Sequence, residues 1–272
     1  MKTALIQMNT YADKKLNIEN ACIRIKVAAE NGADVAVLPE MFCCEYRSRS
    51  FIANKEPCGG EAWQALSAAA AENGIWVVGG SVPEEEDGKI YNTCFVFDRK
   101  GKQVARHRKM HLFDIDVRGG QRFKESDTFT AGEDITVFDT EFGKVGVVIC
   151  FDIRFPELAR LEALKGAKLI VCPAAFNMTT GPAHWEITFR ARAVEDQVFF
   201  AACSPARMED GSYVAYGHSL LVSPWGELLY DAGTGETVLY CEIDPGYADD
   251  IRAQLPLLSA RREDVYELKL RN

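Results

Sequence analysis

Several patterns that mark common protein classes are missing from this sequence. It has no run of about 18 or more apolar residues, the length that a membrane-spanning helix needs. The apolar stretch near its N-terminus is too short for a secretory signal. It also has no internal repeat and no linker rich in proline, glycine or serine. We therefore expect a cytoplasmic chain without membrane contact, whose residues 1–272 form a single domain.

Positive charge is also scarce. The chain has 31 Lys and Arg residues against 40 Asp and Glu residues, which gives a formal net charge of −9. Its longest basic run, Arg106-His107-Arg108-Lys109, is short, whereas a nucleic-acid binder usually shows a basic stripe or a basic balance. We therefore expect no nucleic-acid partner. Hydrophobic residues make up 47% of the chain and charged residues 26%, which favours a folded globular protein over a disordered one.

Signatures of several kinds of catalytic and cofactor site are absent as well. No C-x-x-C occurs, which argues against a structural zinc site or a redox pair. The G-x-S-x-G pattern of serine hydrolases is absent. So are G-x-x-x-x-G-K-[ST] and G-x-G-x-x-G, the two glycine patterns of nucleotide-binding sites. The pair His107 and His111 fails the H-E-x-x-H pattern, because Arg108 stands where the glutamate should be. We expect no metal and no cofactor.

Nine cysteines remain to be explained, and an odd number cannot pair completely within one chain. They stand at positions 22, 43, 44, 58, 94, 150, 172, 203 and 241. In a cytoplasmic protein their thiols should be reduced, and most of them should be small core residues. The question is whether one of them has a chemical role.

Strand-like and helix-like segments alternate along the chain. Strands are predicted at 3–8, 34–38, 75–78, 93–98, 103–106, 135–138, 144–150, 168–172, 198–203, 220–223 and 238–243, and helices at 15–31, 62–72, 156–165 and 183–195. The segments 35–38 and 145–149 are apolar throughout, so both faces of these strands should be covered. The pattern predicts an α/β layered fold with mixed sheets inside and helices outside.

One cysteine, Cys150, ends a buried strand shortly before a helix that begins near Pro156. Ligands in α/β folds bind beyond the carboxyl ends of strands, so this thiol would face a pocket. The N–H groups of the helix start would lower the thiol pKa and could hold an oxyanion. The alternative is an ordinary core cysteine at a strand end.

Two further strand ends carry charged residues. Glu40 follows the apolar strand 35–38, where a carboxylate is either a general base or one half of an ion pair. Alternation along 106–111 points Lys109 inward and leaves the neighbouring arginines in solvent. An inward ammonium would stabilise a thiolate and an oxyanion, and the alternative is a solvated basic edge.

Together these three motifs resemble the nitrilase superfamily of carbon–nitrogen hydrolases, whose triad is Glu-Lys-Cys. The matching segments are Leu38-Pro39-Glu40, Arg108-Lys109 with His111-Leu112-Phe113, and Gly146 through Cys150 with Asp152 and Arg154. The resemblance covers nearly the whole chain. It implies a four-layer α-β-β-α sandwich with two mixed sheets, and catalytic roles for Glu40, Lys109 and Cys150. It also implies a catalytic role for Glu125, the second carboxylate of the site, which would position the substrate nitrogen or Lys109.

Within the superfamily the sequence is most similar to the omega-amidase branch. The similar segments are 109–117, 123–126, 173–186, 204–207 and 213–219. The resemblance implies hydrolysis of the terminal carboxamide of 2-oxoglutaramate and 2-oxosuccinamate. Deaminated-glutathione amidases share Thr180-Gly181-Pro182-Ala183-His184-Trp185, so this activity and that of N-carbamoyl amino acid hydrolases stay open. A non-catalytic binding protein on the same fold and a Cys-His site that uses His218 are further alternatives.

The resemblance also implies residues that bind the substrate, a small amide with a carboxylate. Arg154 would hold that carboxylate with its planar guanidinium, unless it pairs with Asp152 or Glu157. The other residues implied at the pocket are Tyr46, Phe151, Phe176 and Thr180. The sequence departs from the family pattern at Cys43-Cys44-Glu45, which adds a negative charge near the site. Members of the superfamily commonly pair through helices, so a homodimer or a higher homo-oligomer is expected.

Overall fold

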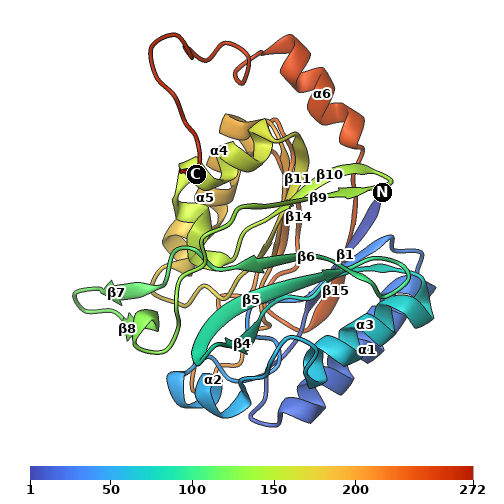
Figure 1. Ribbon diagram of the computed structural model, residues 1–272, viewed down its shortest axis with the longest axis vertical. Coiled ribbons are helices and arrows are strands. Elements are labelled where there is room, and N and C mark those ends of the chain that lie inside the picture. Colours follow the sequence, from blue (N-terminus) through green and yellow to red (C-terminus); the bar gives the residue numbers. More distant parts are fainter. Residues whose placement is uncertain (272) are drawn as a thin grey trace.

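The chain folds into two β-sheets that face each other, in a computed structural model that describes residues 1–271 (Figure 1). The first sheet has seven strands in the order β15-β1-β2-β3-β5-β4, with β6 paired to β5. These strands are β1 (Lys2–Gln7), β2 (Val35–Val37), β3 (Trp76–Val78), β4 (Val82–Glu86), β5 (Lys89–Phe97), β6 (Gln103–Arg108) and β15 (Thr237–Glu242). Strands β1, β2 and β3 are parallel, and the remaining pairs are antiparallel.

The second sheet has six strands in the order β14-β13-β12-β11-β10-β9. They are β9 (Thr136–Thr140), β10 (Gly143–Val147), β11 (Ala167–Pro173), β12 (Phe199–Cys203), β13 (Leu220–Val222) and β14 (Leu228–Asp231). Strands β10, β11 and β12 are parallel. A separate hairpin of β7 (Asp114–Asp116) and β8 (Arg122–Lys124) projects from the body of the molecule in Figure 1.

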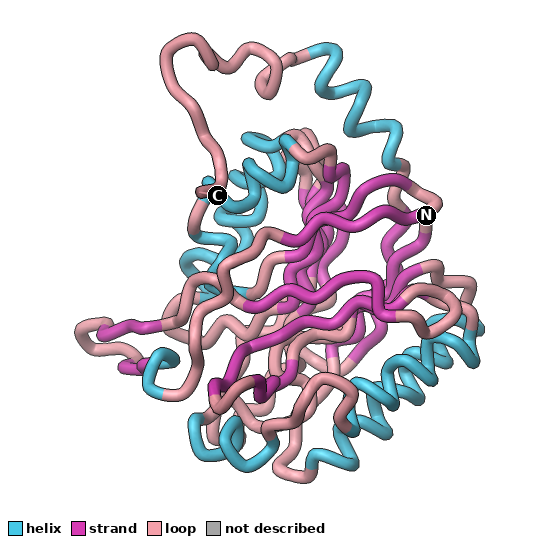
Figure 2. The backbone as a smooth tube through the Cα atoms, in the orientation of Figure 1, coloured by secondary structure: helices cyan, strands magenta, loops and turns pink. Residues whose placement is uncertain are grey.

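Helices cover the outer face of each sheet, as Figure 2 shows. The six helices of the described residues are α1 (Lys14–Glu30), α2 (Ser48–Asn54), α3 (Glu61–Asn73), α4 (Pro156–Leu164), α5 (Gly181–Asp196) and α6 (Pro245–Gln254). Helices α1 and α3 pack on the first sheet, and α4 and α5 pack on the second. Local signals set their ends: the Asp13 side chain accepts from the Leu16 N–H before α1, and Gly74 at φ +59 ends α3.

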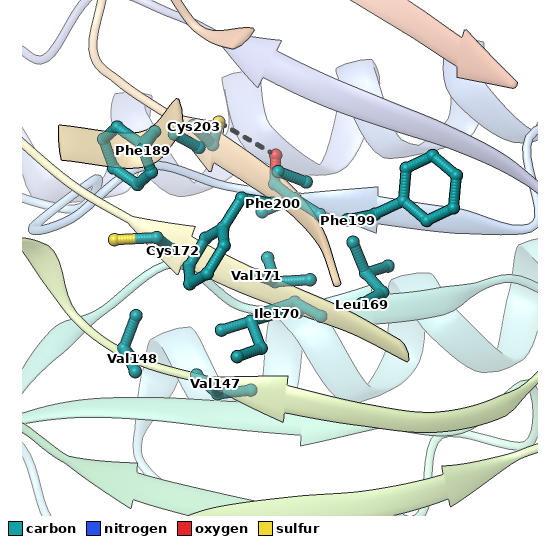
Figure 3. Packing of buried hydrophobic residues seen from close by; sticks show 14 of the residues in the cluster. Val147, Val148, Leu169, Ile170, Val171, Cys172, Phe189, Phe199, Phe200 and Cys203 are labelled. Carbon is teal, nitrogen blue, oxygen red and sulfur yellow. Dashed lines mark hydrogen bonds between the residues drawn. The ribbon is translucent and has the colours of Figure 1, made fainter. Parts of the chain in front are cut away.

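The interior between the sheets is apolar and closely packed. Leu5 and Val37 of the first sheet share one core with Val147 and the neighbouring strands of the second. Figure 3 shows part of this core, in which Cys203 of β12 is buried among the strands. The Cys203 thiol donates to backbone carbonyls of the first sheet, 3.4 Å to Ile6 and 3.3 Å to Val37, and so connects the two sheets.

The fold class predicted from the sequence is confirmed, because two mixed sheets lie between two helical layers. The sequence missed α2, α6, β4, the β7–β8 hairpin and β14, which are short or carry few apolar residues. All nine cysteines are free. Seven are buried, as expected for core residues, but Cys58 is exposed and Cys22 only partly buried.

Candidate functional site

Three of the four predicted catalytic side chains lie just beyond three different strands. Glu40 follows β2, Lys109 follows β6 and Cys150 follows β10. The first two strands belong to one sheet and the third to the other, so the site exists only when the sheets pack together. All three residues are buried, and Lys109 is completely inaccessible to solvent. Strand alternation predicted an inward direction for Lys109, and Lys109 does point inward. Arg106 and Arg108 lie on the more exposed face of the strand.

Lys109 lies between two buried carboxylates. Its Nζ donates to Glu40 Oε1 at 2.8 Å and lies 2.9 Å from Glu125 Oε2. The same oxygen, Glu125 Oε2, accepts from the Phe113 N–H at 2.6 Å, which holds it in place. Burial disfavours the charged form of Lys109, but the two carboxylates outweigh it and raise the Lys109 pKa well above its usual range. The two carboxylates therefore favour the charged ammonium form.

Two neutral side chains bind the same pair of carboxylates. Asn92 on β5 donates through Nδ2 to Glu40 Oε1 at 2.8 Å and to Glu125 Oε1 at 3.1 Å. The Tyr46 hydroxyl lies 3.4 Å from the first of these oxygens and 3.5 Å from the second. Tyr46 was predicted at the site, whereas Asn92 was missed. The predicted strand began at residue 93 and so excluded Asn92, although strand alternation with Cys94 would have shown that both face the interior.

Cys150 starts the short 3₁₀ turn Cys150–Arg154, in a left-handed backbone conformation with φ +47. Such a conformation costs a non-glycine residue about 1–3 kcal/mol, and it is common at functional sites. The thiol interacts with the Glu40 carboxylate and with the backbone N–H of Ala175. The sequence led us to expect a lowered thiol pKa, but burial and then the charge of Glu40 raise the pKa of Cys150. The resting thiol is therefore neutral and needs a base.

Glu40 has the properties of that base. Burial raises its pKa, the charge of Lys109 opposes this effect, and the charge of Glu125 adds to it, with a raised pKa as the net result. Oε1 receives the hydrogen bonds of Lys109 and Asn92, whereas Oε2 is buried and has no hydrogen-bond partner among the described residues. A buried carboxylate with one unused oxygen beside a thiol can take up a proton.

A pocket of about 260 Å³ opens beside Glu40. Tyr46, Ala175 and Tyr213 form part of its wall, and the Tyr213 hydroxyl donates to the Ala175 carbonyl. The charged residues that line it are Glu40, Glu45 and Asp210. The negative charge of Glu45, noted as a departure from the family pattern, is paired with Arg47.

Arg154 lies on another side of the site and does not line this pocket. Its guanidinium stacks on Phe151 and Phe176, with 5.7 Å and 4.8 Å to the ring centres. It makes no ion pair with a carboxylate in the described part of the chain, and its Nε is buried without a partner. Its one polar side-chain contact there is His184 Nδ1, 3.2 Å from Nη1. Burial lowers the pKa of Arg154, as expected for a cation that lacks a counter-charge.

The last predicted pocket residue, Thr180, lies just before α5. Its hydroxyl donates to Asn177 Oδ1 at 3.2 Å, and its backbone N–H donates to the same oxygen at 2.9 Å. Like Arg154, it is not among the residues that line the pocket beside Glu40. The structure thus supports a local role for Thr180 in shaping the start of α5.

Other kinds of site receive little support. Within residues 1–271, no group of three or more His, Cys, Asp or Glu side chains is arranged to hold a metal ion. No helix in that range is both long and apolar enough to cross a membrane. His218, the alternative partner for a cysteine, binds Asp231 through Nδ1 at 3.0 Å.

Comparisons with known proteins identify the family of this chain. A family model described as carbon-nitrogen hydrolase matches residues 2–253. Omega-amidase NIT2-A of Xenopus laevis is 52% identical over 268 residues, which is 98% of this chain and 97% of the relative. The crystal structure of Saccharomyces cerevisiae Nit3, a member of branch 10 of the nitrilase superfamily, has a TM-score of 0.88 and 40% identity. That match covers 97% of this chain and 96% of Nit3.

A third similar protein is an amidase from Nesterenkonia sp., in a mutant form with the acetamide moiety of fluoroacetamide added covalently at the active site cysteine. It is 25% identical, with a TM-score of 0.78, and the match covers 97% of this chain and 95% of the amidase. The resemblance seen in the sequence is confirmed by the family match and by the relatives named omega-amidase. This chain therefore belongs to the carbon–nitrogen hydrolases of the nitrilase superfamily, and it is an amide-hydrolysing enzyme.

Proposed function

We propose that this enzyme hydrolyses the terminal carboxamide of 2-oxo acid amides, 2-oxoglutaramate and 2-oxosuccinamate, to the 2-oxo dicarboxylate and ammonia. The observation that carries the proposal is the buried cluster of Glu40, Lys109 and Glu125 beside the Cys150 thiol. The substrate class is supported by the full-length similarity to proteins named omega-amidase.

In the proposed reaction, Glu40 takes the proton of Cys150 and the thiolate attacks the amide carbon. Lys109 and the backbone N–H of Phe151 then stabilise the oxyanion of the tetrahedral intermediate. Glu40 returns the proton to the amide nitrogen, the C–N bond breaks, and ammonia leaves a thioester on Cys150. Glu40 next takes a proton from water, whose oxygen attacks the thioester and releases the carboxylic acid and the thiol.

Glu125 is proposed to orient Lys109 and to leave Glu40 free for proton transfer. Two carboxylates share one ammonium, and Glu125 is also fixed by the Phe113 N–H. The lysine therefore has little freedom to leave the point where negative charge develops. A fixed donor stabilises a transition state better than one that must reorganise during the reaction.

Arg154 is the proposed anchor for the substrate carboxylate, with Phe151 and Phe176 beside it. The expected alternative, an ion pair with Asp152 or Glu157, is not formed, so the guanidinium remains available for a bidentate contact. The pocket beside Glu40 is lined by acidic residues and by no lysine or arginine, so it offers no cation to an anion. We therefore place the substrate carboxylate on the Arg154 side of Cys150, with Tyr46 beside the reacting amide.

The proposal also covers the oligomeric state, the cellular compartment and the domain organisation of the protein. A homodimer or larger homo-oligomer is supported by an exposed apolar surface, in which Ile187 on α5 and Trp225 are 67% and 53% exposed. Nine free thiols suit a reducing compartment such as the cytoplasm. We also propose that residues 1–272 form one domain, since both sheets contribute to one site.

The test is ammonia release from 2-oxoglutaramate, 2-oxosuccinamate, deaminated glutathione and an N-carbamoyl amino acid. We expect the highest kcat/KM for the first two, no turnover by Cys150→Ala, and an acyl adduct on Cys150 in mass spectra of the quenched wild-type enzyme. A preference for deaminated glutathione, or carbon dioxide released with ammonia from the carbamoyl compound, would replace the substrate assignment. Undiminished turnover by Cys150→Ala would overturn the mechanism.

A further inference from the structure

One fully buried carboxylate near the nucleophile has no part in the proposed mechanism. Asp152 lies two residues after Cys150 and accepts hydrogen bonds from four donors. Two are backbone groups, the N–H of Ile149 at 3.0 Å and the N–H of His111 at 2.9 Å. The other two are imidazole nitrogens, His107 Nε2 at 3.1 Å and His111 Nδ1 at 2.8 Å. Each carboxylate oxygen therefore receives two hydrogen bonds.

The positions of these donors show what Asp152 connects. Ile149 directly precedes Cys150, while His107 and His111 lie two residues before and two residues after Lys109. The lysine segment continues from β6 of the first sheet, and the cysteine segment continues from β10 of the second. One carboxylate thus joins the two chain segments that carry the proposed nucleophile and the proposed oxyanion donor.

The charge of Asp152 determines which partner donates in each of these hydrogen bonds. Burial disfavours its ionised form, but the hydrogen bonds of His107 and His111 outweigh burial and lower the Asp152 pKa below its usual range. An ionised carboxylate can only accept, so His107 Nε2 and His111 Nδ1 must carry the protons in these bonds. The remaining ring nitrogen of His107, Nδ1, lies 3.1 Å from Thr136 Oγ1, which fixes that ring from its other side.

The ring of His111 also supports the far end of the cysteine turn. It stacks on Phe155 with 3.6 Å between ring centres and 9° between planes. Phe155 directly follows the turn Cys150–Arg154, so Asp152 and His111 hold this turn in its middle and at its end. A left-handed residue such as Cys150 keeps its conformation only when surrounding contacts enforce it.

We infer that Asp152, His107 and His111 form a positioning clasp that sets the distance and direction between Lys109 and Cys150. The clasp touches no substrate atom and acts through the two segments that it joins. The inference rests on the proposed roles of Lys109 and Cys150 in amide hydrolysis. It adds residues that set how precisely these two groups face the reacting carbon.

The main test replaces Asp152 by asparagine, which has the same shape but can accept at only one of its two polar ends. At least one histidine or backbone contact is then lost, and Lys109 and Cys150 move relative to each other. We expect Asp152→Asn to lower kcat about 100-fold, the effect that a misplacement of about 1 Å can have, with KM within about threefold of wild type. A kcat within threefold of wild type in the folded variant would overturn the clasp.

A second test uses variants expected to fold normally. His111→Ala removes one donor and the stacked ring, and we expect kcat to fall about tenfold. His111→Asn places an amide N–H near the position of Nδ1 and should recover most of that loss. The matched control is His218→Ala, because His218 also binds an aspartate and is 26% exposed against 28% for His111. The inference is wrong if His111→Asn is no better than His111→Ala, or if His218→Ala loses as much.

Alkylation of Cys150 by fluoroacetamide, followed by mass spectrometry, separates the clasp from the proposed substrate. It reports the reactivity of the nucleophile in each variant without requiring turnover. We expect Asp152→Asn and His111→Ala to react more slowly than wild type and the His218 control to react at the wild-type rate. Equal alkylation rates in all variants would overturn the clasp. A wild type that is alkylated normally but hydrolyses none of the four amides would instead overturn the proposed function alone.

Discussion

Two cations stand close to Cys150, the proposed nucleophile: Lys109 is fully buried and Arg154 is half-buried, and their surroundings are opposite. Lys109 is fully enclosed and contacts two carboxylates, at 2.8 Å and 2.9 Å, which raise its pKa. Arg154 contacts two aromatic rings and a histidine but no carboxylate in the described part of the chain, and burial lowers its pKa. Carboxylates within the fold balance the charge of Lys109, whereas no carboxylate among the described residues balances the charge of Arg154.

The difference fits the two roles that we propose, Lys109 for the reaction and Arg154 for the substrate. A cation enclosed by Glu40 and Glu125 is held in one place, which suits a donor that must already point at a developing oxyanion. A cation with an unused N–H and planar aromatic neighbours suits a ligand with its own carboxylate. The two roles depend on different neighbours, so they can be disrupted separately.

The largest effect is expected where the enclosed cation is removed. Lys109→Ala takes away an oxyanion donor and leaves two buried carboxylates without their shared counter-charge. We expect kcat to fall about 100- to 1,000-fold and the free energy of unfolding to fall by about 3–5 kcal/mol. Rates and urea denaturation curves measure the two effects.

Arg154→Ala is the control for stability in this comparison. It breaks no ion pair within the described residues, so its free energy of unfolding should stay within about 1 kcal/mol of wild type. If Lys109→Ala and Arg154→Ala lowered the free energy of unfolding equally, the ion pairs of Lys109 would not distinguish the two cations in stability.

A smaller loss of activity is expected at Asn92, the neutral donor shared by the two carboxylates. Asn92→Ala removes two hydrogen bonds to charged acceptors but keeps the ion pairs with Lys109. We expect kcat to fall about tenfold through poorer placement of Glu40. The preference for charged over neutral amides, which we assign to Arg154, should not change. A changed preference would mean that the two regions are coupled.

The third expected effect is a shift in pH dependence. Glu40 must be ionised to act as a base, so kcat/KM falls as the pH drops through its pKa, which burial and the charge of Glu125 raise. Glu125→Gln removes one of these causes, lowers the pKa of Glu40, and moves the acidic limb of kcat/KM to lower pH. Arg154→Lys should leave the limb where it is. An acidic limb that stays in place or moves upward in Glu125→Gln would contradict this assignment.

The sequence predicted the part of the site that depends on strand ends. Glu40 and Cys150 both follow apolar strands, and ligands in α/β folds bind beyond the ends of such strands. Lys109 was predicted because alternation along a strand gives the direction of each side chain. The layered fold was likewise predictable, because the strands buried on both faces require helices on each side.

Contacts between segments distant in the chain could not be predicted in the same way. The four hydrogen bonds of Asp152 join two segments that continue from strands of different sheets, and no local pattern shows that His107 and His111 converge on it. The pKa of Cys150 was expected to be lowered by nearby N–H groups, but the depth of burial and the closeness of Glu40 decided its direction. Such quantities depend on how the sheets pack rather than on the order of residues.

The most direct test of the account is the effect of Arg154 on the choice between charged and uncharged substrates. The measurement is kcat/KM for 2-oxoglutaramate and for a neutral amide of similar length, in the wild type and in Arg154→Ala. We predict a loss of about 30-fold or more for 2-oxoglutaramate, mostly through KM, because a charge-assisted contact is removed, and a loss of less than about threefold for the neutral amide. Equal losses for the two substrates would contradict the claim that Arg154 is kept unpaired in order to bind the substrate carboxylate.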